Sequence, residues 1–347
     1  MLCLVCACMS LSACNKKSTS PGSKSPVYSN YSTYVFFGTD SRAAGDDWKT
    51  DDSTGTEGAP SSDVIMLLTV NNDTDEAKIL SVYRDTMLDV AGDGTDFEKC
   101  NTAYRDGGAY GAIDMLEKNL DLHIDGYVTA NFMSVADAID LLGGVDVDIE
   151  DVKTTESHKD AGDDVVDIMN NLIDEMNSIY GSSTPHIEHA GKQTLTGLQS
   201  VAYSRVRYTE GSDMVRTERQ RNVVALMAQK LKSVDTETQH TVLKEMYKKV
   251  DTDMAENELM SLFDVLVDYD LGSMKGFPFH LNRLFDDEKG AMYVPCDLET
   301  NVAELHSLIY DNNDYTPSST VTSYSKGIEE ESGMTADSAD ESLSAYN

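Results

Sequence analysis

Short apolar runs separated by turn signals predict strands in the first half of the chain. Residues 34–38 and 64–70 have the mostly apolar pattern of short interior strands, and residues 78–83 predict a third strand. The turn signal Asn71-Asn72-Asp73 separates the second run from the third, which predicts a β-hairpin. Further along, apolar residues alternate with acids over residues 145–149, as expected for a half-exposed strand.

Apolar residues at helical spacing are interleaved with these strand patterns. The spacing predicts helices over residues 109–120, 132–142, 165–179 and 213–232, a helix-like stretch near 194–200, a strand over 201–208, and further helix and strand signals over 252–315. Strands interleaved with helices indicate an α/β (α+β) fold, with a central mixed β-sheet flanked by helices on both faces.

The two ends of the chain differ in composition from this body. We divide the sequence into a signal-like segment (1–14), a polar linker (15–33), a main domain (34–315) with a peripheral acidic insertion (151–190), and a tail (316–347). The tail is rich in Ser, Thr, Glu and Asp and has few large apolar residues, so we expect it to be disordered.

The first fourteen residues are typical of an export signal. An apolar stretch ends in Leu11-Ser12-Ala13-Cys14 and is followed by polar residues, a pattern that resembles a bacterial lipobox. The resemblance implies cleavage before Cys14 and a lipid on Cys14, which would anchor the chain on the extracellular face of the cytoplasmic membrane. The alternative is an ordinary buried amino-terminal helix.

Charge and cysteine content exclude some classes of protein. Lys and Arg number 27 and Asp and Glu 61, a net charge of −34 that repels nucleic acid and argues against general nucleic-acid binding. Four of the six Cys lie in the first fourteen residues, so the body carries neither a disulfide framework nor a zinc site. Cys100 and Cys296 remain, and in an oxidising compartment they can pair.

Against this acidic background, five of the nine arginines fall within seventeen consecutive positions: Arg205, Arg207, Arg216, Arg219 and Arg221. The first two are two apart in the strand pattern and so share a face, whereas Arg216, Arg219 and Gln220 share one helix stripe. Guanidinium groups bind phosphate oxygens bidentately, so the cluster indicates an anion site. The alternative is that these arginines only offset acidic neighbours.

Two aspartates lie at predicted strand ends. Asp40 follows the first strand and Asp63 precedes the second, so both carboxylates emerge at one edge if the strands are antiparallel neighbours. Mg²⁺ takes one or two carboxylates and completes its shell with water and phosphate oxygens, so the pair fits a Mg²⁺-bridged pyrophosphate. Taken singly, either Asp is more often an ordinary turn or cap residue.

An ordered series of motifs resembles the LytR-CpsA-Psr family over residues 34 to about 232. The matching segments are Gly38-Thr39-Asp40-Ser41-Arg42, Ser62-Asp63, Ser81-Val82-Tyr83-Arg84-Asp85-Thr86, Lys99-Cys100-Asn101-Thr102-Ala103-Tyr104, Leu141-Leu142-Gly143-Gly144-Val145, Tyr203-Ser204-Arg205-Val206-Arg207, and Asp213, Arg216, Arg219-Gln220. The chain has Ser61, Val64 and Tyr83 where the family commonly has Arg, Thr and Pro.

The resemblance implies a Mg²⁺-dependent extracytoplasmic phosphotransferase. Members of the family move a glycopolymer, such as wall teichoic acid or capsular polysaccharide, from an undecaprenyl-pyrophosphate carrier to peptidoglycan, and hold the polyprenyl tail in an apolar pocket. By resemblance, the apolar faces of residues 109–142 would line that pocket; the alternative is that they are ordinary core.

The same resemblance assigns roles to individual residues. Asp40 and Asp63 would hold the metal; Arg84, Lys99, Arg205, Arg207, Arg216 and Gln220 would bind the pyrophosphate; and Arg42, Asp85, Asn101, Asp213 and Arg219 would support them. Asp40 or Asp85 would assist deprotonation of the attacking sugar hydroxyl. Two rival functions fit the same residues: a non-catalytic surface lipoprotein that binds polyprenyl phosphate, and a pyrophosphatase acting on the same lipid.

Overall fold

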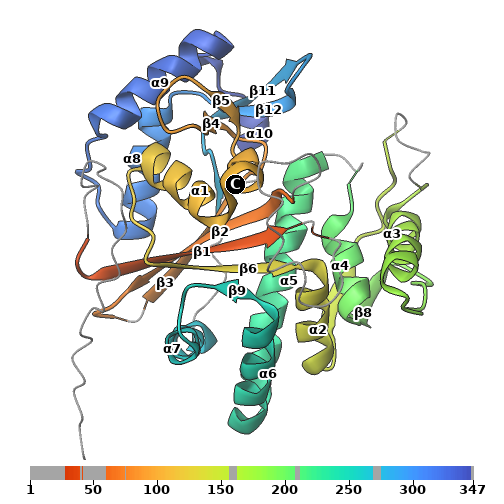
Figure 1. Cartoon of the computed structure of the whole chain (residues 1–347). Helices are drawn as coiled ribbons and strands as arrows, with labels where there is room; N and C mark the ends of the chain where they lie inside the picture. Colours follow the sequence, from red (N-terminus) through yellow and green to blue (C-terminus); the bar gives the residue numbers. More distant parts are fainter. Residues whose placement is uncertain are drawn as a thin grey trace, which may run out of the picture.

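The computed structural model describes residues 28–39, 41, 60–74, 76–155, 162–207, 212–268 and 275–344. At its centre is a six-stranded mixed sheet with the order β10-β3-β2-β1-β6-β9 (Figure 1). Its strands are β1 (Tyr31–Thr39), β2 (Ser62–Asn71), β3 (Glu76–Val82), β6 (Gly126–Asn131), β9 (Asp251–Thr252) and β10 (Lys275–Phe277). The mixed sheet predicted from the alternating patterns is confirmed.

Strand pairing brings the end of β1 next to the start of β2. β1 runs antiparallel to β2, with Thr39 opposite Ser62, and parallel to β6 on its other side. β2 and β3 form the predicted hairpin, with Asn71 opposite Glu76. Because β1 ends where β2 begins, the residues that follow Thr39 and those that open β2 are at the same end of the sheet.

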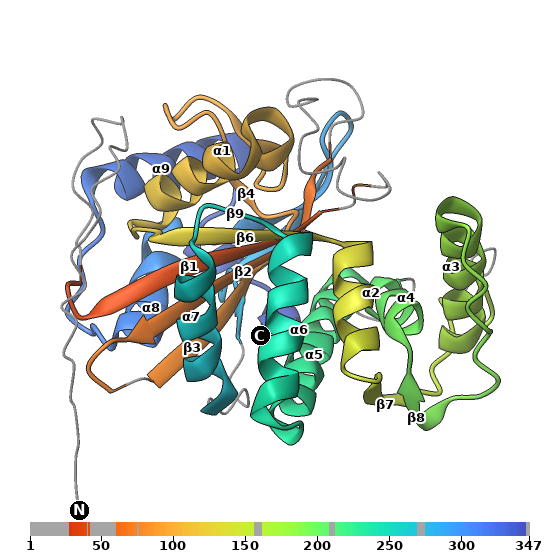
Figure 2. The same cartoon turned by 60° about the horizontal axis from the view of Figure 1, so that its bottom comes forward.

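Helices cover both faces of the sheet, as predicted (Figure 2). On one face lie α1 (Thr102–Leu120), α8 (Leu298–Tyr310) and α9 (Ser319–Ser332), and on the other α5 (Ser212–Ser233), α6 (Thr236–Lys249) and α7 (Glu256–Asp268). Val35 and Phe37 of β1 join the core under the first group, whereas Phe36 joins the cluster on the opposite face. This division follows the two-residue alternation of side chains along a strand.

A lateral lobe extends from the β6 side of the sheet (Figure 1). It contains α2 (Phe132–Leu141), β7 (Val145–Ile149), α3 (Val165–Tyr180), β8 (Gly191–Leu195) and α4 (Gly197–Arg205). These elements share an apolar core of their own. In β7 the three apolar residues are buried and the two aspartates exposed, which confirms the predicted half-exposed strand.

The strand predicted over residues 201–208 is not found in its described part, because residues 201–205 are the end of helix α4. α4 begins with a capping box formed by Thr196 and Gln199, and all of its residues up to Tyr203 are buried. A helix buried on every side has no polar stripe, so its apolar run resembles that of a strand. Arg205 ends α4 and Arg207 follows it, so the two arginines do not share a strand face.

The carboxyl-terminal tail, predicted to be disordered, is folded over its described residues up to 344. Three apolar side chains of α9 at helical spacing, Val321, Tyr324 and Ile328, are buried in the main core. Ahead of α9, the backbone N–H and the hydroxyl of Ser318 each donate to the Asp121 carboxylate at 2.7 Å. The prediction of disorder was wrong because it used the average composition of the tail, in which a few buried apolar residues carry little weight.

The sheet also begins earlier than predicted, because residues 31–33 of the expected linker belong to β1. Ahead of them, the Tyr28 ring stacks on Tyr310 with 4.2 Å between the ring centroids. The Tyr28 hydroxyl also lies 3.1 Å from Nδ1 of His306, a buried histidine whose pKa falls to about 4 mainly because burial disfavours its charged form. These contacts fix the start of the domain on α8.

Small elements complete the fold. They are β4 (Met87–Asp89), β5 (Phe97–Lys99), β11 (Leu281–Asp286), β12 (Gly290–Pro295), the short 3₁₀ helix η4 (Ala336–Ser338) and α10 (Glu341–Ser344). Cys100 and Cys296 are both buried and free, so the disulfide that they could have formed is not present. Within the described ranges, no helix combines the length and the apolar character needed to cross a membrane.

Candidate functional site

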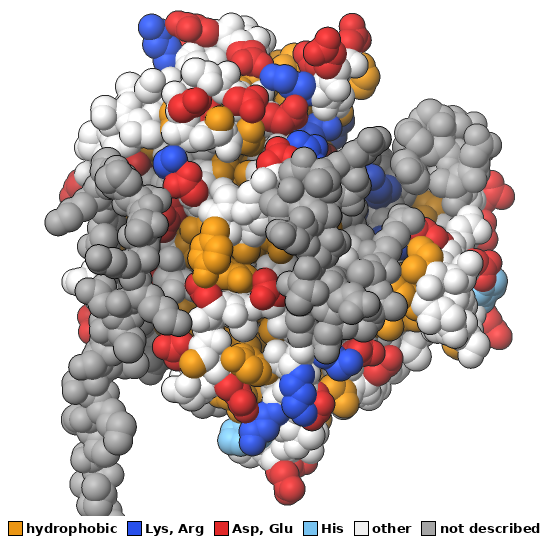
Figure 3. Space-filling view, in the orientation of Figure 1, with side chains coloured by type: hydrophobic (Ala, Val, Ile, Leu, Met, Phe, Trp, Pro, Cys, Tyr) orange, Lys and Arg blue, Asp and Glu red, His pale blue; other side chains and the backbone are white. Residues whose placement is uncertain are grey.

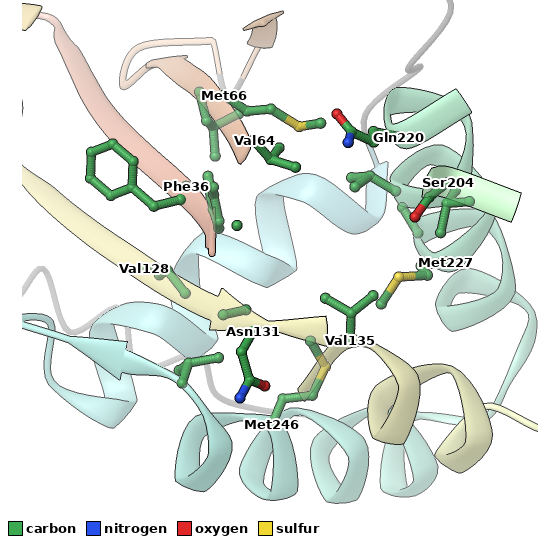
Figure 4. Close-up of a pocket in the computed structure, with 18 of the residues that line it drawn as sticks. Phe36, Val64, Met66, Val128, Asn131, Val135, Ser204, Gln220, Met227 and Met246 are labelled. Carbon is green, nitrogen blue, oxygen red and sulfur yellow. The ribbon is translucent and has the colours of Figure 1, made fainter. Parts of the chain in front are cut away.

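An apolar cavity of about 250 Å³ lies between the sheet and helices α5, α6 and α7, with α2 at one side (Figure 4). Strand side chains such as Phe36 and Val128 form one wall, and Met227 and Met246 belong to the helical wall. α1 packs on the opposite face of the sheet, so the apolar residues of α1 are ordinary core. Within residues 109–142, the lining comes from β6, α2 and Leu142 only.

Among the described residues that line the cavity, three have polar side chains, and two of these make local hydrogen bonds. Asn131 Oδ1 accepts from the backbone N–H of Ser134 at 2.9 Å and so caps α2, and the Ser204 hydroxyl donates to Val201 O at 2.8 Å. Gln220 Oε1 is buried and has no hydrogen-bond partner among the described residues. Gln220 therefore brings an unsatisfied buried acceptor from α5 to a lining that is otherwise mostly apolar.

The lining residues bring distant parts of the predicted site together. In Figure 4, Val64, Gln220 and Ser204 all lie on the upper and right sides of the cavity. Val64 follows Asp63, Ser204 precedes Arg205, and Gln220 lies one helical turn after Arg216. The start of β2, the end of α4 and the first turns of α5 thus converge on one end of an apolar space. Figure 3 shows Lys and Arg side chains in a recess at the right of the view, toward α3 and α4.

Arg84 is the centre of the charged cluster next to β2. It forms an ion pair with Asp63, and its Nε lies 3.5 Å from Asp85 Oδ2. Lys99 Nζ lies 4.0 Å from the other oxygen of Asp85. Positive and negative side chains thus alternate from Asp63 through Arg84 and Asp85 to Lys99. Each of these four side chains is at most 23% exposed.

Backbone hydrogen bonds join the two segments that carry these charges. The N–H groups of Cys100 and Asn101 donate to Thr86 O and Arg84 O at 2.8 and 3.2 Å. The Cys100 thiol also lies 3.3 Å from Arg84 O. Burial raises the pKa of this thiol far above its usual value, so Cys100 remains protonated. Asn101 precedes α1, and its buried Oδ1 has no hydrogen-bond partner in the described part of the chain.

Arg205 is held from two sides by residues that the sequence analysis did not single out. Its Nη2 lies 3.6 Å from Glu175 Oε2 of α3, and its guanidinium carbon lies 4.8 Å from the centroid of the Phe132 ring. Glu175 belongs to the insertion that the sequence indicated as peripheral. No sequence signal links it to Arg205, because the contact depends on how α3 packs on α4.

Arg219 is buried inside the lobe, in contrast to an exposed phosphate ligand. Its side chain is 3% exposed, its Nε lies 3.5 Å from Glu150 Oε2, and its Nη1 donates to Val206 O at 3.3 Å. The Tyr203 hydroxyl donates to the other oxygen of Glu150 at 3.1 Å, and burial followed by the charge of Glu150 raises its pKa. These bonds position the backbone between Arg205 and Arg207.

Several predicted site residues lie outside the described residues: Cys14, Asp40, Arg42 and the side chain of Asp213. Asp40 directly follows Thr39, so the pairing of Thr39 with Ser62 places the exit of β1 beside Asp63. The described part of the chain contains no cluster of three His, Cys, Asp or Glu side chains that could hold a metal ion by itself. Mg²⁺ does not require one, because water and phosphate oxygens complete its shell. The buried hydroxyls of Thr39 and Ser62, which have no described hydrogen-bond partner, add two oxygens at this edge.

The contacts of Arg219 predict a structural role that can be separated from ligand binding. Arg219→Lys keeps the charge, but one ammonium group cannot reproduce the fork that reaches both Val206 O and Glu150. We expect the free energy of unfolding to fall by about 1–3 kcal/mol, as for buried polar groups that lose a partner. Chemical denaturation measures it, with the more exposed Arg207→Lys as the control, for which we expect a change below about 0.5 kcal/mol. Full stability of Arg219→Lys would instead support direct contact with the ligand.

Two curated teichoic acid transferases are similar in sequence to this chain. The polyisoprenyl-teichoic acid–peptidoglycan teichoic acid transferase TagV of Bacillus subtilis is 25% identical over 259 residues, which are 74% of this chain and 61% of that protein. The corresponding transferase TagU of Halalkalibacterium halodurans is 34% identical over 165 residues, 47% of this chain and 45% of its own length. The chain thus spans about half to three fifths of the curated relatives that it matches.

Solved structures share the fold. The crystal structure of B. subtilis TagV superposes with a TM-score of 0.60 and 22% identity, over 83% of this chain and 99% of that one. A structure of TagT bound to LIIa-WTA gives a TM-score of 0.53 and 19% identity, over 88% of this chain and 92% of that one. The model of the LytR_cpsA_psr family matches residues 6–301, most of the chain. The chain therefore belongs to the LytR-CpsA-Psr family.

Proposed function

We propose that this chain is an extracytoplasmic phosphotransferase that moves a teichoic acid or capsular glycopolymer from a polyprenyl-pyrophosphate carrier to peptidoglycan. The observation that carries the proposal is an apolar cavity that ends at segments bearing clustered cations, in a protein with a net charge of −34. A ligand with a long hydrocarbon tail and a compact polyanionic head fits such a space. The names of TagV and TagU, both teichoic acid transferases, support the same reaction.

In this proposal the polyprenyl tail occupies the cavity and the pyrophosphate lies at its charged end. Burial of the tail against residues such as Phe36 and Met227 contributes roughly 25 cal/mol per Å² of apolar surface removed from water. Arg84, Arg207 and Arg216 bind the phosphate oxygens, and Gln220 contributes its amide. Arg205 and Lys99 take part while paired with Glu175 and Asp85, respectively, which keeps both cations in place before the ligand arrives.

Asp63, together with Asp40, would hold Mg²⁺ at the end of the sheet where β1 ends and β2 begins. When bound, the ion would neutralise charge on the phosphates. Asp63 already pairs with Arg84, so the carboxylate and the guanidinium present opposite charges to the same head group. Asp85 lies between Arg84 and Lys99, contacts that support a role in orienting the two cations.

The reaction forms one bond to phosphorus and breaks another. A peptidoglycan sugar hydroxyl attacks the phosphorus that carries the glycopolymer; the bond from that phosphorus to the bridging oxygen breaks, and polyprenyl monophosphate leaves with the bonding electrons. The hydroxyl proton passes to a carboxylate, Asp40 or Asp85, and then to water. The arginines stabilise the charge that develops on the departing oxygen, so catalysis depends on positioning and electrostatics.

We propose that Cys14 carries a lipid that anchors the protein on the extracellular face of the cytoplasmic membrane, next to the cell wall. Tyr28, where the described domain begins, is fourteen residue steps after Cys14, and an extended chain of that length reaches about 46–50 Å. The domain can therefore remain close to the membrane that supplies a polyprenyl substrate.

Loss of one phosphate-binding arginine should reduce the rate strongly. For Arg207→Ala we expect a loss of about 2–4 kcal/mol of transition-state stabilisation, the range seen when a single preorganised donor is removed. The measurement is release of polyprenyl monophosphate from a pyrophosphate-linked disaccharide with Mg²⁺ and a peptidoglycan acceptor. The exposed Arg283→Ala is the matched control and should keep the wild-type rate. Equal rates for both variants would contradict the role of Arg207 in binding phosphate. Release of polyprenyl monophosphate without a peptidoglycan acceptor would indicate a pyrophosphatase. Binding of the substrate without release would indicate a lipid-binding protein.

Filling the cavity should separate binding of the tail from binding of the head group. In Met227→Trp a larger ring enters the apolar space, and we expect about tenfold weaker binding of geranylgeranyl pyrophosphate because overpacking excludes the tail. Inorganic pyrophosphate should bind as in the wild type, and calorimetry measures both. Val152→Trp, at an exposed position that is not part of the cavity lining, serves as the control. Unchanged binding of the prenyl compound by Met227→Trp would show that the tail does not occupy the cavity.

The proposed anchor predicts a specific effect of one cysteine. In bacteria, Cys14→Ser should move the protein from the membrane fraction to the medium and abolish incorporation of radiolabelled palmitate, because the thiol proposed to carry the lipid is lost. Cys8→Ser, six residues earlier in the same segment, should have neither effect. Membrane retention of the Cys14→Ser protein would show that another segment anchors the chain.

A further inference from the structure

The carboxyl-terminal end of the chain folds back onto the charged side of the molecule. After α9, η4 and α10 lie along β11 and β12 (Figure 1). The backbone N–H of Asp340 donates to Leu281 O at 2.9 Å, and Asn282 Nδ2 donates to Ser338 O at 2.6 Å. The segment is thus bound to β11 by its backbone as well as by side chains. It lies beyond Asn301, where the match to the family model ends.

Leu343 completes a small apolar cluster that is separate from the main core. Its five members, Tyr83, Met214, Leu281, Tyr293 and Leu343, are all buried. The rings of Tyr83 and Tyr293 lie 5.7 Å apart at 50°. The cluster therefore joins four parts of the chain: the end of β3, the start of α5, the β11–β12 hairpin and α10.

Two of these side chains are next to candidate pyrophosphate ligands. Tyr83 directly precedes Arg84, and Met214 lies two residues before Arg216 on the first turn of α5. The backbone supports the same link, because the N–H of Tyr293 donates to Asp85 O at 2.9 Å and that of Tyr83 donates to Phe277 O at 3.0 Å. Motion of the cluster would therefore displace Arg84 and Arg216 together.

We propose that Leu343 is a positioning residue, through which the folded carboxyl-terminal segment holds Tyr83 and Met214 and so keeps Arg84 and Arg216 in register. The expected effect of Leu343 on turnover rests on the proposed function. Its expected effect on the order of the backbone does not. Leu343 belongs to the same buried apolar cluster as Tyr83 and Met214 and is the member that the carboxyl-terminal segment contributes.

The test compares Leu343→Ala and Leu343→Met with the wild-type full chain. Amide hydrogen exchange at residues 83–86 and 214–220 should become at least about tenfold faster in Leu343→Ala, because the shared apolar contact is lost. With pyrophosphate-linked substrate, kcat should fall about tenfold, since small displacements of charged groups are costly. Leu343→Met retains an apolar side chain of similar volume and should restore both quantities to within about twofold.

Val321→Ala is the control for a loss of packing alone. Val321 is fully buried in α9, in the main core and outside the Leu343 cluster. It should lower the Tm without changing exchange at residues 83–86 and 214–220, or kcat. Equal exchange at those residues in Leu343→Ala and Val321→Ala would overturn the inference, even if the wild type has no transferase activity. Altered exchange together with unchanged kcat in an active enzyme would overturn the link to turnover.

Discussion

The antiparallel pairing of β1 with β2 is the constraint on which the site depends. It brings the residues that leave β1 and those that open β2 to one end of the sheet, next to the cavity between the sheet and α5. On its other side, β1 runs parallel to β6. β6 is followed directly by α2, the first element of the lateral lobe. Charged segments far apart in sequence thus converge at the edge of an apolar space.

The cations at this edge are held by anions in an acidic protein. Arg84 pairs with Asp63 and Asp85, Arg205 with Glu175, and Arg219 with Glu150. Such pairs add little net stability where solvent reaches them, but they fix the positions of the guanidinium groups. Preorganised charges stabilise a reacting phosphate without rearranging during the reaction.

Patterns with a strong period were predicted well. The hairpin, the half-exposed strand β7, the amphipathic helix α3 and the long helix α5 were all found close to the expected residues. Two helical segments, the end of α4 and α9, were not predicted as helices, each for its own reason. α4 has no exposed face, and α9 is anchored by only three apolar side chains within a polar sequence.

The sequence by itself determined most of the elements, the mixed sheet, the family and the residues whose chemistry suits a pyrophosphate, because periodicity and ordered motifs are local properties of the chain. Only the tertiary structure decided which of those residues share a place. It separated Arg219 as an internal support, brought Glu175 to Arg205, and moved the cavity wall from α1 to α5, α6 and α7. It also brought Leu343 into one buried cluster with Tyr83 and Met214. These contacts join residues far apart in the chain, and no local pattern encodes such a distance, because it depends on how complete elements pack.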